Sequence, residues 1–176
     1  MSTYVTFPGT AGDYVYTPDT NLLDANTAHL DQALGNWVTV GGVTGLTQSS
    51  ARAAFGSNSG EGTAAFAETA KIRWGTHAGG TLPAVGPGVE VAVSVNVGSD
   101  NTALSCRITW VPRDSGGSSL GVTTSAWVAL GNNLDAVLTG TLTTPASTVS
   151  LEVWLEYGID PTGIPTNGDL LYWDAV

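Results

Sequence analysis

Glu152, Trp154 and Glu156 stand at alternate positions of the stretch "VSLEVWLEYG". Alternate residues of an extended strand point to the same side, so the spacing predicts one face that is both polar and aromatic. A flat indole ring can stack on a sugar ring while carboxylates accept hydrogen bonds from sugar hydroxyls. These three residues are therefore a candidate glycan-binding site. The alternative is that Trp154 packs under a loop or against a neighbouring subunit.

Catalytic patterns are scarce. The Cα atoms of Glu152 and Glu156 should lie about 13 Å apart along a strand, which is too far for a retaining glycosidase pair. His29 and His77 have no metal-ligand spacing. The stretch "DSGGS" around Ser115 has the Gly-Gly chemistry of a hairpin turn, which we favour over a serine nucleophile. We expect no enzyme.

Charge excludes several partners. Five basic residues stand against 15 acidic ones, giving a net charge of −10, so nucleic acid and anionic membrane surfaces would be repelled. No apolar run reaches the roughly 20 residues of a membrane span. The start "MSTYVTFPG" has neither the basic nor the apolar region of a secretory signal. Cys106 is the only cysteine, so no internal disulfide can form.

The hydrophobic period is two along most of the chain. In "VEVAVSVNV" every second residue from Val89 to Val97 is valine, and "ALSCRITW" and "VSLEVWLEYG" alternate in the same way. Further strands are expected in "AETAKIRWG", "SAWVALG", "DAVLTGTLTTP" and "DLLYWDAV", with turn residues between them. This pattern predicts an all-β, antiparallel sandwich or barrel. We expect Trp37, Trp74 and Trp110 in its core, because each has apolar neighbours.

Two segments depart from this alternation. "DANTAHLDQALG" fits either a short helix ending at Gly35 or an irregular, extended entry to the sandwich. The segment 56–63, "GSNSGEGT", has the composition of a mobile loop.

The stretch "NLLDANTAHLDQALGNW" resembles the opening of a jelly-roll module of bacteriophage tail proteins. Further similarities to such carbohydrate-binding-module-type jelly rolls are "GPGVEVAVSVNV", "GTLTTPASTVSLEVWLEYG" and "GDLLYWDAV". The matching positions in the opening are Asn21, Leu22, Leu23, Ala25, Asn26, Asp31 and Trp37. The resemblance implies a jelly-roll β-sandwich over residues 21–176, with residues 1–20 as an extra strand or docking arm.

The same resemblance implies a structural virion surface protein of a tailed bacteriophage, such as a minor tail protein that contacts host-surface glycans. Its partners would be other virion proteins, further copies of itself and a host cell-wall polysaccharide, after assembly in the host cytoplasm. A capsid decoration protein with the same sandwich is one alternative, and a carbohydrate-binding module of a secreted enzyme is another. A stand-alone lectin-like hydrolase is disfavoured, because no paired carboxylate motif is present.

The resemblance also bears on the Asp within the apolar closing stretch "DLLYWDAV". In similar jelly rolls the first and last strands run side by side, and their acidic residues meet at a structural calcium. The matching residues are Asp31 and Asp174, with oxygen atoms of Asn21 or Asn26 as further ligands. The alternative is that Asp174 accepts hydrogen bonds from backbone N–H groups at the sheet edge, without metal.

Overall fold

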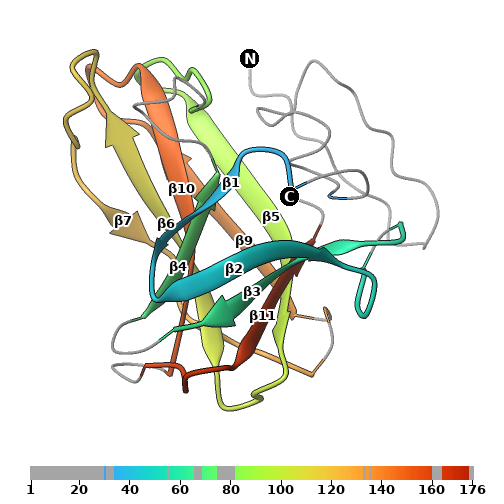
Figure 1. Cartoon of the computed structure of the whole chain (residues 1–176). Helices are drawn as coiled ribbons and strands as arrows, with labels where there is room; N and C mark the ends of the chain where they lie inside the picture. The colour runs from blue at the N-terminus through green and yellow to red at the C-terminus, as the bar shows by residue number, and fades with distance from the viewer. Residues whose placement is uncertain are drawn as a thin grey trace.

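The computed structural model describes residues 30, 34–54, 56–65, 69–74, 82–132, 134, 136–159 and 164–174. These residues form two antiparallel β-sheets that pack face to face (Figure 1). The protein is an all-β jelly-roll sandwich, so the predicted fold class is confirmed. The described residues contain no helix, and therefore none long and apolar enough to cross a membrane.

The first layer, sheet A, has the strand order β1-β4-β10-β6-β7, and β8 also pairs with β6. Its central strand, β10, pairs along most of its length with β6 and with β4. The bounds are β1 Trp37–Gly41, β4 Ala70–Trp74, β6 Ser105–Arg113, β7 Thr123–Thr124, β8 Val128–Ala129 and β10 Ser150–Gly158.

The second layer, sheet B, has the order β2-β3-β11-β5-β9. The last strand, β11, lies inside this sheet between β3 and β5. Asp174 is therefore not on an edge strand. The first described strand, β1, belongs to sheet A and does not pair with β11. The bounds are β2 Val43–Ser49, β3 Ser59–Ala64, β5 Glu90–Ser99, β9 Ala136–Thr143 and β11 Leu170–Asp174.

The core lies between the two sheets and is made by the alternating residues that the sequence indicates. Each buried valine of β5 contributes about 1.5–3 kcal/mol, whereas Val89 precedes the strand and is exposed. Trp37 and Trp110 are buried as predicted; the side chain of Trp74 is outside the described part. Buried core residues include Val91, Val93, Val95, Val97, Cys106, Ile108, Leu138, Leu151, Val153, Leu155, Tyr157 and Trp173.

Two buried groups of the core titrate above their ordinary range. Complete burial raises the pKa of the Cys106 thiol, and it also raises the pKa of the Tyr157 hydroxyl. The Tyr157 hydroxyl donates a hydrogen bond of 2.8 Å to the carbonyl oxygen of Tyr172 and so ties β10 to β11 across the sandwich. Both side chains are structural and uncharged at neutral pH.

The prediction of a mobile loop over residues 56–63 is wrong for its second half, because β3 begins at Ser59. β3 pairs with β2 on one side and with β11 on the other. An added Cβ at Gly60 would stand 2.2 Å from Cε2 of Trp173, so the bare backbone makes room for that indole. Trp173 in turn packs on Trp37, with ring centroids 5.5 Å apart.

The remaining predictions have mixed outcomes. The turn in "DSGGS" is confirmed: the N–H of Gly117 donates to the carbonyl of Asp114, whose carboxylate accepts from Gly116 and Ser118. The strand in "SAWVALG" is only the two residues of β8. The docking arm of residues 1–20 and most of "DANTAHLDQALG" lie outside the described residues.

Candidate functional site

Glu152, Trp154 and Glu156 lie together on the outer face of β10, as predicted. The neighbouring strands add side chains in register: Trp154 stands beside Arg73 of β4 and Thr109 of β6, and Glu156 beside Lys71 and Arg107. We call this surface the β10 face; it comprises Lys71, Arg73, Arg107, Thr109, Arg113, Trp127, Glu152, Trp154 and Glu156.

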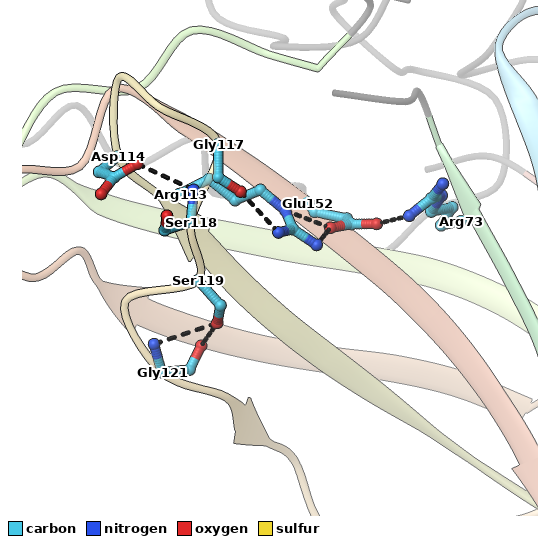
Figure 2. A network of polar contacts seen from close by, with 8 residues as sticks. All are labelled: Arg73, Arg113, Asp114, Gly117, Ser118, Ser119, Gly121 and Glu152. Carbon is cyan, nitrogen blue, oxygen red and sulfur yellow. Dashed lines mark hydrogen bonds and ion pairs between the residues drawn. The ribbon is translucent and has the colours of Figure 1, made fainter. Parts of the chain in front are cut away.

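Glu152 is completely buried on this face, although alternation alone predicts a solvent-facing position. Its carboxylate lies between two guanidinium groups, those of Arg73 and Arg113 (Figure 2). The Nε of Arg113 donates to Glu152 Oε2 at 2.6 Å, and its Nη1 donates to the carbonyl of Gly117 at 2.8 Å. One carboxylate thus joins β4, β10 and β6, and through Gly117 it also fixes the turn after β6.

Glu156 forms a second polar cluster along the same strand. Its Oε2 accepts hydrogen bonds from Arg107 Nε at 2.8 Å and from Thr109 Oγ1 at 3.2 Å. The guanidinium of Arg107 lies 4.4 Å from the ring centroid of Trp127, which is a cation–π contact. Glu156 therefore fixes Arg107, and Arg107 in turn orients the indole of Trp127.

Trp154 lies between these two carboxylates and is half-buried. Its Nε1–H is shielded from solvent and has no hydrogen-bond acceptor among the described residues. The Nε of Arg73, on the adjacent strand, is likewise buried without an acceptor in the described part. The indole is thus set among hydrogen-bonding side chains, in contrast to the apolar inner face of β10.

This arrangement is suited to binding. Both carboxylates form ion pairs with arginine, which fixes the positions of the side chains on this face. The partly exposed indole rings of Trp127 and Trp154, together with partly exposed guanidinium groups, are the chemistry of a surface that stacks on and hydrogen-bonds to sugars.

The sequence reasoning missed the basic residues and Trp127. A usable signal was present: Lys71 and Arg73 are two apart, and Arg107, Thr109 and Arg113 are spaced by even numbers, so each set had to share a face of its strand. Register across strands was needed to bring the two sets onto the face of Glu152.

Of the second predicted site, the calcium pair, Asp174 belongs to the described residues. Asp174 is completely buried on β11 and accepts a 2.7 Å hydrogen bond from the backbone N–H of Ala54. Asp31, Asn21 and Asn26 lie outside the described residues. The described residues hold no group of three or more side chains that could bind a metal.

The environment of Asp174 is built by the segment between β2 and β3. Arg52 of this segment lies over the ring of Tyr172, 4.6 Å from its centroid. Burial raises the pKa of the Tyr172 hydroxyl, and the guanidinium of Arg52 partly offsets the rise. Asp174 and the β10 face belong to different sheets, so they are separate features.

The calcium prediction stays testable by thermal melting. If Asp174 helps to bind calcium, the ion at 100 times its dissociation constant should add about 2.7 kcal/mol to the free energy of unfolding, a shift of roughly 5–11 °C for a domain of this size. Asp174→Asn should abolish the difference between calcium and chelator. Identical melting temperatures of the unaltered protein in both conditions would leave Asp174 as a purely hydrogen-bonded residue.

No protein-family model and no curated protein sequence matches this chain. Solved structures do resemble it. The C-terminal family 22 carbohydrate binding module of Clostridium thermocellum Xyn10B superposes with a TM-score of 0.61 at 17% identity, covering 86% of this chain and 92% of that one. The CBM22-1 xylan-binding domain from Paenibacillus barcinonensis Xyn10C gives a TM-score of 0.60 at 18% identity, covering 80% and 83%.

A bacteriophage protein is also similar. The enzymatically active domain of tailspike protein 4 of bacteriophage CBA120 gives a TM-score of 0.59 at 12% identity, covering 91% of this chain and 22% of that one. At these identities the likeness concerns the fold alone. It supports a jelly roll of the carbohydrate-binding-module type, and it does not single out a phage tail protein.

Proposed function

We propose that this chain is a non-catalytic carbohydrate-binding module that holds a polysaccharide on the β10 face. The observation that carries the proposal is Trp154: a half-buried indole on the outer face of a sheet, with hydrogen-bonding side chains on both neighbouring strands. The similarity to a ligand-binding module and to a xylan-binding domain supports it. This was an alternative to the virion role at the level of sequence, and it now has the stronger support.

The test is the variant Trp154→Ala. Loss of a stacking contact worth about 1–2 kcal/mol, by analogy with base–aromatic stacking, should weaken polysaccharide binding roughly tenfold. The melting temperature should stay close to that of the unaltered protein. Affinity gel electrophoresis against xylan and other plant and bacterial wall polysaccharides gives the first readout, and calorimetry then measures the affinity.

Val137→Ala is a suitable control, because Val137 is exposed on the outer face of sheet B. It should change neither binding nor melting. A fall of many degrees in Trp154→Ala, with unchanged affinity per folded molecule, would show that Trp154 only packs.

A second candidate function is a virion surface protein, which the similarity to the tailspike domain favours. Such proteins work in symmetric assemblies, and β9 offers an edge for one. The described edge strands β1 and β2 contain bulges, and β7 and β8 have two residues each. β9 is regular over eight residues and carries no charge or proline, so it lacks the usual protection against pairing with another strand.

The β9 sequence is also self-complementary. "LTGTL" reads the same in both directions around Gly140. In an antiparallel pair of copies centred on Gly140, Thr139 would face Thr141 of the second copy, and Leu138 would face Leu142. Sheet B of one copy would then continue into sheet B of the other, and a two-fold axis through Gly140 would relate the two copies.

Light scattering across a concentration series tests this candidate. Thr139→Lys with Thr141→Lys would set like charges opposite each other and should yield a monomer. Ala92→Lys with Ser94→Lys, exposed on the adjacent strand β5, should leave the dimer intact. A monomeric unaltered protein at all concentrations would overturn pairing through β9.

Deletion of residues 2–20 should abolish incorporation into particles if that segment is a docking arm.

A further inference from the structure

The positive charge of this acidic chain is gathered on one surface. Of the five basic residues in a protein of net charge −10, four belong to the β10 face. They are Lys71, Arg73, Arg107 and Arg113. The fifth, Arg52, lies over Tyr172 on sheet B.

The carboxylates of the β10 face do not balance these cations. Glu152 and Glu156 supply two negative charges against four positive ones, which leaves an excess of two positive charges. The other acidic side chains of the described residues belong to sheet B and its loops or, for Asp114, to the turn after β6, where Oδ1 accepts two backbone N–H groups. They are Glu61, Glu90, Asp100, Asp114, Asp169 and Asp174.

The excess charge lies on Lys71 of β4 and on the two arginines that share Glu152, one of which is also on β4. Glu152 is shared by Arg73 and Arg113, and Glu156 is bonded to Arg107 and Thr109. Within the described residues, Lys71 makes no ion pair. Lys71 and Arg73 are two residues apart on one face of β4, so their Cα atoms lie about 6.5–7 Å apart.

These two cations flank the candidate stacking platform. Arg73 is the cross-strand neighbour of Trp154, and Lys71 is the cross-strand neighbour of Glu156, the next outward residue of β10. A sugar ring stacked on the indole would bring a substituent at its edge toward β4. A neutral sugar would leave Lys71 without a counter-charge and Arg73 sharing one carboxylate with Arg113, whereas an acidic sugar would place its anion beside both cations.

We propose that the ligand of the β10 face is an anionic polysaccharide, whose acidic groups are read by Lys71 and Arg73 beside Trp154. This inference rests on the proposed carbohydrate-binding function and specifies its substrate class. The segregation of charge supports this inference. A positive face on a strongly negative protein orients that face toward an acidic polymer, and the polymer repels the other surfaces of the module.

The experiment compares acidic polymers with their own neutral forms. Polygalacturonate, alginate and glucuronoxylan are each assayed alongside the carboxyl-reduced polymer, in 50 mM and in 500 mM sodium chloride. Dextran sulfate and neutral dextran form a further pair, which distinguishes sulfate from carboxylate as the source of the anion. At low salt, at least one acidic polymer should bind about tenfold more tightly than its neutral form, and high salt should reduce that ratio.

Two charge-matched variants locate the effect. Lys71→Gln should reduce the ratio of the affinities for the acidic and the neutral polymer about threefold to fivefold, as expected for the loss of one partly exposed ion pair. Arg52→Gln removes the same charge from sheet B and should leave the ratio unchanged.

Equal affinity for the acidic and neutral forms of every pair would overturn the anionic ligand while leaving carbohydrate binding intact. An equal effect of the two variants would also overturn it, because net charge alone would then explain the preference. If no polymer of either form binds, the proposed function itself fails.

Discussion

Replacement of Gly60 by alanine should destabilise the protein by about 3 kcal/mol, at the upper end of the usual cost of overpacking a core. The new Cβ would lie 2.2 Å from Cε2 and 2.4 Å from Cζ2 of Trp173. Trp173 is completely buried and packs on Trp37, so it cannot swing into solvent. Thermal unfolding should show a fall of roughly 6–12 °C for a domain of this size.

Gly86→Ala is the matched control, because its Cβ would meet no atom closer than 4.0 Å and its φ lies outside the left-handed region. It should be neutral or slightly stabilising. The clash itself is tested by combining Gly60→Ala with Trp173→Phe, which removes part of the indole. The double variant should lose less stability than the sum of the two single losses. Strict additivity would place the cost of Gly60→Ala elsewhere.

The sequence predicted none of β1, β2, β3 and β7, and Gly60 shows why β3 escaped prediction. Apolar residues at every second position predict β5, β6, β9 and β10, because both partners of the core contacts of these strands are side chains. β3 reads "SGEGTA", and its core-facing positions include two glycines. The side chain that fills this space, Trp173, comes from a strand more than a hundred residues away. A pattern of apolar side chains cannot reveal a strand that has glycine at its core-facing positions.

In the candidate site, too, some features follow from the local sequence and others depend on residues far away in the chain. That Glu152, Trp154 and Glu156 share a face follows from strand geometry alone, and it is confirmed. That Glu152 is buried could not be predicted, because its two arginines lie 79 and 39 residues away in the chain. Burial of a carboxylate on an outer face depends on cross-strand register, which alternation does not provide.

Replacement of Glu152 by glutamine should cost about 2–3 kcal/mol in the free energy of unfolding. Removal of one partner from a fully buried ion pair typically costs about 3–5 kcal/mol. Here the cost is lower, because the Arg73 and Arg113 side chains are 24% and 21% exposed, so water partly solvates the cations that lose their partner. Chemical denaturation measures the difference, which should appear as a lower midpoint with an unchanged slope.

Glu90→Gln removes the same charge from an exposed position of β5 and should change stability by no more than about 0.5 kcal/mol. Adding Arg73→Met to Glu152→Gln should recover part of the loss, because the unpaired guanidinium is then gone as well. If the cost comes from lost packing of the Glu152 side chain, that second substitution will lower stability further. Recovery would show that Glu152 stabilises the protein by compensating the charges of Arg73 and Arg113, which would otherwise repel each other between β4 and β6.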